Sequence, residues 1–220
     1  MTEKKEAELL DADADEVPEL MVEPVDKLDI IKKICVIGDS GVGKKTILGK
    51  IAPFRKDWER YTETIGAAIT KYTLGYSLVT ADLNLLIIVW DVTGKADYQR
   101  MQPSYYKGAE AIVVMADAHD KSSIDNIPNW IRAAYKVTGL IPTVVVINKT
   151  DLVPEERRKA LDRYVRTVCA KYEVPIFYTT RENTAESLKL PFATIAEMLA
   201  QRIKTQLAKR RFKRQNMGQQ

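Results

Sequence analysis

The sequence contains 220 residues with a formal net charge of +4, and 45% of them are hydrophobic, which is enough to form one full-sized core. The length suits a single α/β domain of roughly 160–180 residues with a tail at each end. The longest apolar run, 85–90, is far too short to cross a bilayer, and the acidic N-terminus lacks the apolar segment of a secretory signal. Cys35 and Cys169 lie far apart in apolar runs, without the spacing of a zinc site or a disulfide framework. We therefore expect a soluble, cytoplasmic protein.

The two ends of the chain carry opposite charge. Residues 1–28 contain ten acidic residues and three lysines with little apolar periodicity, which predicts a disordered acidic arm. The folded domain is expected over 29–208, and a basic tail over 209–220. Residues 202–214 contain seven Lys and Arg residues and no acid. Such a basic end could meet nucleic acid, an anionic membrane or the chain's own acidic arm, and the simplest alternative is a solvated helix end.

Strand-like and helical segments alternate along the folded domain, a pattern typical of a parallel sheet with crossover helices. Single strands are predicted at 31–37, 111–116, 143–147 and 175–178. Two consecutive strand-like runs, 67–80 and 83–90, are separated by a short polar break and predict an antiparallel hairpin that adds an edge to this sheet. A stripe of apolar residues at three- and four-residue steps predicts a last helix that docks on the sheet. The stripe consists of Phe192, Ile195, Leu199, Ile203 and Leu207.

A glycine-rich turn follows the first of these strands and leads directly into a helical pattern. Glycines let the backbone turn with its N–H groups facing inward, and the start of the helix adds positive potential, so this context is typical of a phosphate-binding loop. Lys44 is placed to reach the β- and γ-phosphates of a nucleotide. The pattern predicts a three-layer P-loop NTPase fold, with a mixed, mostly parallel sheet of about six strands flanked by helices. The residues expected around the phosphates are Asp39, Ser40, Gly41, Val42, Gly43, Lys44, Lys45 and Thr46.

Lys45 departs from the usual phosphate-loop pattern. That position normally holds a Ser or Thr whose hydroxyl binds Mg²⁺, whereas here Thr46 comes one residue late. An ammonium group cannot ligate a cation. Two arrangements remain open: Mg²⁺ bound by fewer protein ligands, or Lys45 standing in the place of the metal and neutralising the phosphates. Both arrangements weaken Mg²⁺-dependent turnover.

A second motif follows the strand predicted at 143–147. Asn148, Lys149, Thr150 and Asp151 lie at the carboxyl end of that strand, the edge where open α/β sheets bind ligands. The Asp151 carboxylate is suited to accept the two N–H groups of guanine, which adenine lacks. The motif therefore indicates GTP or GDP as the ligand and disfavours a P-loop kinase or ATPase of another class.

Five sequence blocks resemble the Ras-like small GTPases, and within them the Rab proteins, from about residue 29 to residue 204. They are GDSGVGK at 38–44, YTETIG at 61–66, WDVTG at 90–94 with SYYKGA at 104–109, DKSSIDNIPNWIR at 120–132, and NKTD at 148–151. The resemblance implies a nucleotide-controlled switch in which Thr64 contacts Mg²⁺ and the γ-phosphate. It also implies that Asp91 senses the metal and Gly94 the γ-phosphate, so the metal ligands expected here are Thr64, Asp91 and Thr46.

The resemblance extends to the guanine site and to partner binding. It places Trp58 near the face of the base, and Thr179, Thr180 and Arg181 in the loop beside it. Effector and regulator proteins are expected to bind through two switch segments, 54–72 and 91–107.

Lys95 stands where this family usually has a glutamine that orients the attacking water. A cation cannot accept the proton of that water, although it can stabilise charge on the γ-phosphate. We therefore expect a slow GTP hydrolase whose catalytic residues are Lys44, Thr64, Gly94 and Lys95. The alternative is a Rab-like scaffold protein with a fixed nucleotide state or none, which the substitutions at Lys45 and Lys95 favour.

The residues near the C-terminus determine how we expect the chain to contact a membrane. Rab proteins usually end in prenylated cysteines, but no cysteine follows Cys169, so prenylation is not expected. Contact with an anionic membrane should rest on 202–214 alone and be weak, reversible and salt-dependent. We expect a monomer that does not bind nucleic acid.

Overall fold

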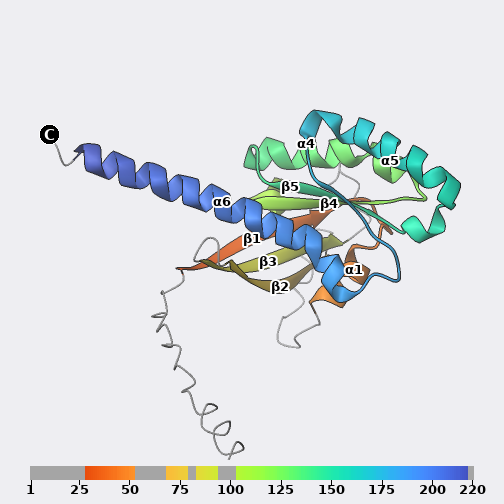
Figure 1. Cartoon of the computed structure of the whole chain (residues 1–220), viewed down its shortest axis with the longest axis horizontal. Coiled ribbons are helices and arrows are strands. Elements are labelled where there is room, and N and C mark those ends of the chain that lie inside the picture. The colour runs from red at the N-terminus through yellow and green to blue at the C-terminus, as the bar shows by residue number, and fades with distance from the viewer. Residues whose placement is uncertain (1–27, 53–67, 79–82, 94–102, 218–220) are drawn as a thin grey trace, which may run out of the picture.

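The computed structural model describes residues 28–52, 68–78, 83–93 and 103–217. A six-stranded sheet in the order β2-β3-β1-β4-β5-β6 forms its centre (Figure 1). The strands are β1 (Leu28–Ile37), β2 (Ala68–Leu78), β3 (Leu83–Thr93), β4 (Ala111–Asp117), β5 (Thr143–Asn148) and β6 (Ile176–Tyr178). All neighbouring strands run parallel except β2 and β3, which pair antiparallel along their full lengths. The mixed sheet and the hairpin predicted from the sequence are confirmed.

Helices cover both faces of the sheet (Figure 1). The helices are α1 (Lys44–Ile51), α2 (Pro103–Tyr106), α3 (Lys121–Asp125), α4 (Ile127–Thr138), α5 (Glu155–Cys169) and α6 (Ala185–Met217), with short 3₁₀ turns at Thr150–Leu152 and Ala170–Tyr172. Side chains of α1 and α6 share one hydrophobic core with the sheet, and those of α2 to α5 share a second. The result is the three-layer arrangement predicted for this chain.

Successive side chains of β1 point to opposite faces of the sheet and so contribute to both hydrophobic cores. Ile34 and Val36 face the core of α1 and α6, while Cys35 and Ile37 face the core of α2 to α5. Strand β4 is almost entirely apolar and buried, as a central parallel strand covered on both faces must be. The carboxyl ends of β1, β4 and β5 are therefore fixed by packing on both sides, and these ends carry the two sequence motifs.

Helix α6 is longer than its apolar stripe. Phe192, Ile195, Leu199 and Ile203 are buried as expected, whereas Leu207 remains 37% exposed. The helix continues past this point to Met217, so residues 209–217, interpreted from the sequence as a tail, are helical. No helix in the described parts of the chain is both long enough and apolar enough to span a bilayer.

Candidate functional site

The turn between β1 and α1 is built around close backbone approaches. Gly38 has a φ of 137°, and a Cβ atom there would lie 2.1 Å from the carbonyl oxygen of Met115 in β4. Gly43 has a φ of 102°, and a Cβ atom there would lie 2.3 Å from Nδ2 of Asn148. Only glycine fits these two positions without displacing the neighbouring strand ends. The turn is thereby held against β4 and β5 with the N-terminus of α1 behind it.

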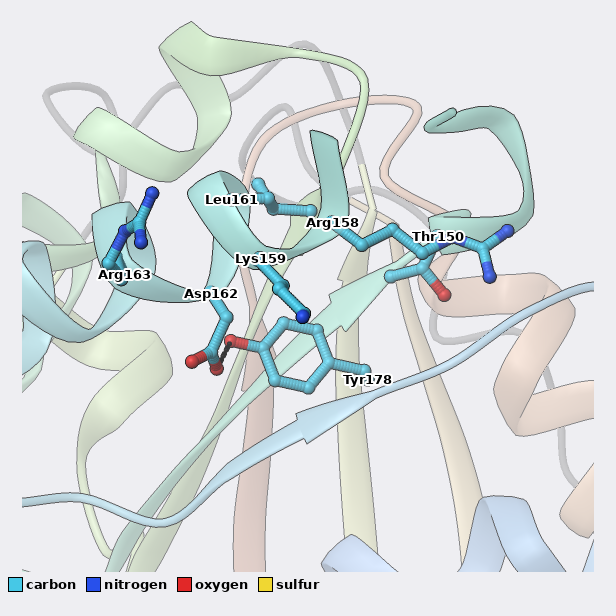
Figure 2. Close-up of a pocket in the computed structure, with 7 residues that line it drawn as sticks. All are labelled: Thr150, Arg158, Lys159, Leu161, Asp162, Arg163 and Tyr178. Atoms are coloured by element: carbon cyan, nitrogen blue, oxygen red, sulfur yellow. Dashed lines mark hydrogen bonds between the residues drawn. The ribbon is translucent and has the colours of Figure 1, made fainter. Parts of the chain in front are cut away.

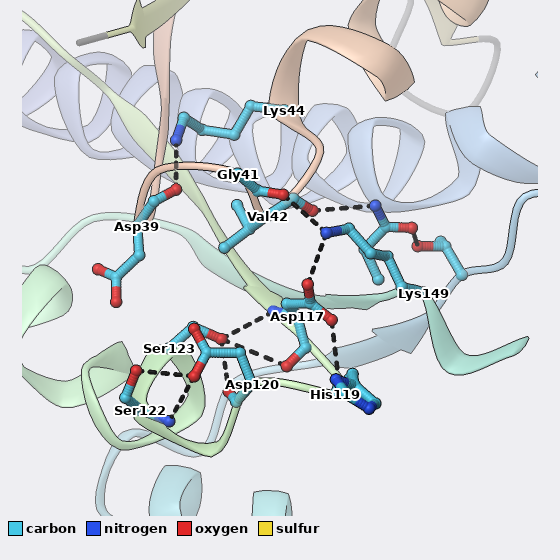
Figure 3. Close-up of polar contacts among 12 residues, drawn as sticks. Asp39, Gly41, Val42, Lys44, Asp117, His119, Asp120, Ser122, Ser123 and Lys149 are labelled. Atoms are coloured by element: carbon cyan, nitrogen blue, oxygen red, sulfur yellow. Dashed lines mark hydrogen bonds and ion pairs between the residues drawn. The ribbon is translucent and has the colours of Figure 1, made fainter. Parts of the chain in front are cut away.

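Lys44 is folded into this turn. Its Nζ donates hydrogen bonds to the carbonyl oxygens of Gly38 (2.7 Å) and Asp39 (2.8 Å), the second of which is drawn in Figure 3. Only 7% of the residue is exposed. Burial lowers the pKa of the Lys44 ammonium, and the carboxylates of Asp91 and Asp39 oppose this shift. The turn thus holds a desolvated ammonium group beside the backbone N–H groups at the start of α1, a combination suited to phosphate oxygens.

Asp39 connects the turn to α4. One of its carboxylate oxygens accepts a hydrogen bond from the indole Nε1 of Trp130 (2.7 Å), and the other accepts one from Nδ2 of Asn126 (2.8 Å). Trp130 is 2% exposed, so its indole is fixed by the core of α2 to α5. Both carboxylate oxygens are therefore used to position the turn. No local pattern in the sequence indicated this role, because about ninety residues separate the partners.

The residues of the second motif brace the same turn. Nδ2 of Asn148 donates to the carbonyl oxygen of Val42 (3.0 Å), and Oδ1 of Asn148 accepts from the hydroxyl of Thr179 (2.9 Å). Nζ of Lys149 donates to the carbonyl oxygen of Gly41 (2.8 Å) and to the Asp117 carboxylate (2.6 Å), as Figure 3 shows.

Asp117 was not among the residues expected from the sequence, whereas Thr179 was expected in the loop beside the guanine site. Asp117 is the last residue of β4, and Thr179 directly follows β6. Both therefore lie at the carboxyl edge of the parallel sheet, and this position is the signal that could have identified Asp117.

The loop after β6 reaches the far end of this motif. The backbone N–H of Arg181 donates to Oδ1 of Asp151 (3.2 Å), and the hydroxyl of Thr180 donates to Asn183 (3.2 Å). Asp151 is exposed, with its second oxygen open to a ligand as far as the described residues show. Three segments far apart in sequence, the turn, the motif at 148–151 and the loop at 179–181, thus meet at one edge of the sheet, as expected for a nucleotide site.

Asp91 lies near the end of β3 with no exposed surface, and neither carboxylate oxygen has a hydrogen-bond partner among the described residues. Burial raises the pKa of the Asp91 carboxyl to about 6, while the charges of Lys44 and Lys45 oppose this rise. A buried carboxylate without partners suits a cation. Asp91 therefore fits the Mg²⁺ that the nucleotide chemistry implies.

Lys45 and Thr46 are both exposed on the first turn of α1. The ammonium of Lys45 cannot act as a ligand, and the role of the Thr46 hydroxyl as a ligand remains a prediction. The described parts of the chain hold no cluster of three or more His, Cys, Asp or Glu side chains that could bind a metal. Among the described residues, Asp91 is an expected metal ligand whose buried carboxylate without hydrogen-bond partners would suit a cation.

Several expected site residues lie outside the described residues. They are Trp58, Thr64, Gly94 and Lys95. The same holds for most of the two predicted switch segments, of which the structure describes 68–72, 91–93 and 103–107. Their roles remain predictions.

A separate pocket of about 540 Å³ opens between α5 and β6 (Figure 2). It is lined by Thr150, Arg158, Lys159, Leu161, Asp162, Arg163 and Tyr178. The hydroxyl of Tyr178 donates to Asp162 (2.7 Å), and the Thr150 hydroxyl donates to the carbonyl oxygen of Thr179 (3.1 Å). The pocket shares only Thr150 with the motif at 148–151, so it is distinct from the phosphate cradle.

A mixed, mostly parallel sheet with a glycine-rich phosphate cradle before its first helix defines a P-loop nucleotide-binding domain. Comparison with known proteins identifies the family. Residues 33–151 match the model of the Roc (Ras of Complex) domain of DAPkinase. The chain belongs to the Ras superfamily of small GTPases.

The related proteins are Rab proteins and similar GTPases. The chain is 30% identical to the Ras-related protein RABG3d of Arabidopsis thaliana over 160 residues, which cover 70% of this chain and 75% of that protein. It is 30% identical to the GTP-binding protein ypt5 of Schizosaccharomyces pombe over 182 residues, covering 80% and 81% of the two chains. It is 29% identical to the Ras-related protein Rab7 of Pisum sativum over 171 residues, covering 75% and 80%. The predicted membership of the Rab-like branch is confirmed.

Proposed function

We propose that this chain is a molecular switch that binds GTP and GDP and hydrolyses GTP slowly. The observation that carries the proposal is the junction of Asn148 and Lys149 with the phosphate cradle, through hydrogen bonds of 3.0 and 2.8 Å to the carbonyl oxygens of Val42 and Gly41. This junction sets the spacing between the cradle and Asp151, which faces the base. The names of the relatives, which include a GTP-binding protein, agree with this ligand.

Guanine specificity is tested by competition against a fluorescent GDP analogue. Unlabelled GTP and GDP should displace the analogue at far lower concentration than ATP. Asp151→Asn should weaken guanine binding and shift the preference towards xanthine nucleotides, while Asp162→Asn, a paired aspartate in the separate pocket, is the matched control and should change neither. Equal displacement by ATP and GTP contradicts the proposal.

The magnesium dependence should be weak because Lys45 replaces a hydroxyl ligand and its charge already acts on Asp91. EDTA should release GDP from the Lys45→Thr variant faster than from the wild type. Lys45→Gln separates the two causes, since it removes the charge without restoring a hydroxyl. If EDTA releases nucleotide equally from the wild type and the Lys45→Thr variant, Lys45 does not substitute for the metal.

Slow hydrolysis follows from two altered positions, Lys45 in place of a metal-binding hydroxyl and Lys95 in place of a glutamine. Thr64, Gly94 and Lys44 would then act on the γ-phosphate without a full metal site and without a residue that orients the water. Single-turnover rates at saturating Mg²⁺ should rise most in the double variant Lys45→Thr with Lys95→Gln. The rise should exceed the product of the two single effects, because both groups act on one transition state. A wild type as fast as the double variant contradicts this part of the proposal.

A nucleotide-locked scaffold is the second candidate, favoured by the proximity of the Lys45 charge to the buried Asp91 carboxylate. The nucleotide content of the purified protein, with and without Mg²⁺, separates the two functions: a switch exchanges its nucleotide, and a scaffold retains one or contains none. In either case effector and regulator proteins would bind through 54–72 and 91–107.

We further propose that the chain is a cytoplasmic monomer. Any membrane contact would be peripheral and would rest on 202–214. Sedimentation equilibrium tests the monomer, and salt-sensitive binding to anionic vesicles tests the contact.

A further inference from the structure

The C-terminal part of α6 carries concentrated positive charge beyond the body of the domain. Residues 204–209 are all exposed, and Figure 1 shows the helix extending past the end of the sheet. The stretch 202–214 holds seven Lys and Arg residues and no acid. Five of these cations lie within the six residues 209–214, and an anionic occupant would relieve their mutual repulsion.

The first strand begins beside the same stretch of α6. Ile30 of β1 packs against Ala200 and Ile203, which are 5% and 8% exposed. Strand β1 starts at Leu28, so the preceding chain joins the domain within two residues of this contact. The last buried residue of the α6 stripe thus lies next to the point where residues 1–27 are attached.

The attached segment has the complementary composition. Residues 6–26 contain nine acidic residues and no Lys or Arg. A tether of a few residues gives two binding partners an effective concentration in the millimolar range, so weak contacts that would fail between separate molecules become significant. The interaction should be screened by salt, since the Debye length falls from about 10 Å at 0.1 M to about 3 Å at 1 M.

We propose that the acidic arm, residues 1–27, binds in cis to the basic segment of α6, residues 202–214, and so competes with anionic surfaces for its cations. The contact uses none of the nucleotide-site residues. Its test is therefore independent of whether the chain binds GTP.

The direct test is zero-length carbodiimide cross-linking of the full chain, which joins carboxylates to lysines in contact. We expect intramolecular cross-links from the arm to Lys209 or Lys213, and we expect them to disappear at 0.5 M salt. Cross-links found only in dimers would show that a second copy is the occupant and would overturn the cis contact. Absence of any cross-link between the arm and α6 at low salt would also overturn it.

The functional test measures binding to vesicles of phosphatidylcholine with 30% phosphatidylserine at 0.1 M salt. An arm-neutral variant of the full chain carries Asp11→Asn, Asp13→Asn, Asp15→Asn and Glu16→Gln. It should bind the vesicles about tenfold more tightly than the wild type, because cations released from the arm become available to the anionic surface. Binding equal to that of the wild type would refute the competition.

Lys209→Gln, made in both the wild type and the arm-neutral variant, separates the release of α6 cations from the loss of arm charge alone. It should reduce vesicle binding by about fivefold in the arm-neutral variant, where Lys209 is available to the surface, and by clearly less in the wild type, where the arm covers it. An equal reduction in both backgrounds would show that the arm does not act through α6, and the proposal would be wrong. Cooperative urea unfolding of each variant confirms that its domain is folded.

Discussion

Replacing Asp91 by asparagine removes a charge from a fully buried position without changing the shape of the side chain. Burial raises the pKa of this carboxyl from 3.8 to about 6, so the folded chain holds the proton more tightly than the unfolded chain does. The stability of the wild type should therefore fall as pH rises from about 4 to about 6 and change no further above that. Two pKa units correspond to about 3 kcal/mol of unfolding free energy.

The assay is urea unfolding of the nucleotide-free protein at several pH values between 4 and 8. The Asp91→Asn variant and the wild type should have similar unfolding free energies near pH 4, where the carboxyl is protonated in both states. At pH 7 the variant should be more stable by about 3 kcal/mol. The difference between the two curves isolates Asp91, because every other group titrates in both proteins.

Asp162→Asn is the matched control with the opposite sign. Hydrogen bonds from Arg166 and Tyr178 lower the pKa of the Asp162 carboxyl, so its contribution to stability is present above the ordinary pKa and is lost as pH falls. That variant should be slightly less stable than the wild type at pH 7. If the difference in unfolding free energy between Asp91→Asn and the wild type stays constant from pH 4 to pH 8, this would falsify the view that Asp91 is a desolvated carboxylate suited to a cation.

Three further predictions concern the packing of the site. Trp130→Phe removes the hydrogen bond to Asp39 and should accelerate release of a fluorescent GDP analogue about tenfold, consistent with the 1.5–3 kcal/mol typical of hydrogen bonds to a charged group; an unchanged release rate would show that the bond does not position the turn. Gly38→Ala should lower the unfolding free energy by about 3 kcal/mol because its Cβ meets the backbone of β4, whereas Gly49→Ala, with open space around it, should be neutral or stabilising in urea unfolding; equal costs would contradict this. Cys35 is buried with its pKa raised to about 11, so maleimide should label it at pH 7 only after unfolding, as mass spectrometry would show; rapid labelling of the folded chain would be inconsistent with its burial.

The strands and the phosphate turn were predictable because their signals are local. The apolar runs of β4 and β5 gave bounds within one residue of those observed, since central parallel strands are continuously apolar. Strand β6 begins at Ile176 rather than at residue 175, because proline has no N–H for the sheet; the carbonyl oxygen of Pro175 still accepts from Val145.

The end of α6 shows where an apolar stripe misleads. The apolar stripe ends at Leu207, and the sequence therefore predicted that the helix ends near residue 208. In the structure the stripe is buried only as far as Ile203. Packing and helix formation are separate properties, however, and the Lys, Arg, Gln and Ala residues that follow all favour a helix. The buried face thus indicated where the helix leaves the domain but not where it ends.

Contacts between distant segments could not be predicted from the sequence. The bond between Asp39 and Trp130 requires knowing that α4 crosses beside the phosphate turn, which depends on the whole sheet order. The pairing of Asp117 with Lys149 was missed for a similar reason: the strand end marks Asp117 as a candidate, but its partner depends on Lys149 pointing back across the edge of the sheet.

The bracing of the phosphate turn by late residues has a consequence for synthesis of the chain. Val42 is paired with Asn148, 106 residues later, and Gly41 with Lys149, 108 residues later. A ribosome adding roughly 5–20 residues per second needs about 5–20 s to cover that interval. During this time the nascent chain displays a glycine turn that its own partners cannot yet support. Nucleotide can therefore bind tightly only after β5 has left the ribosome, which makes binding a late event in the synthesis of each new molecule.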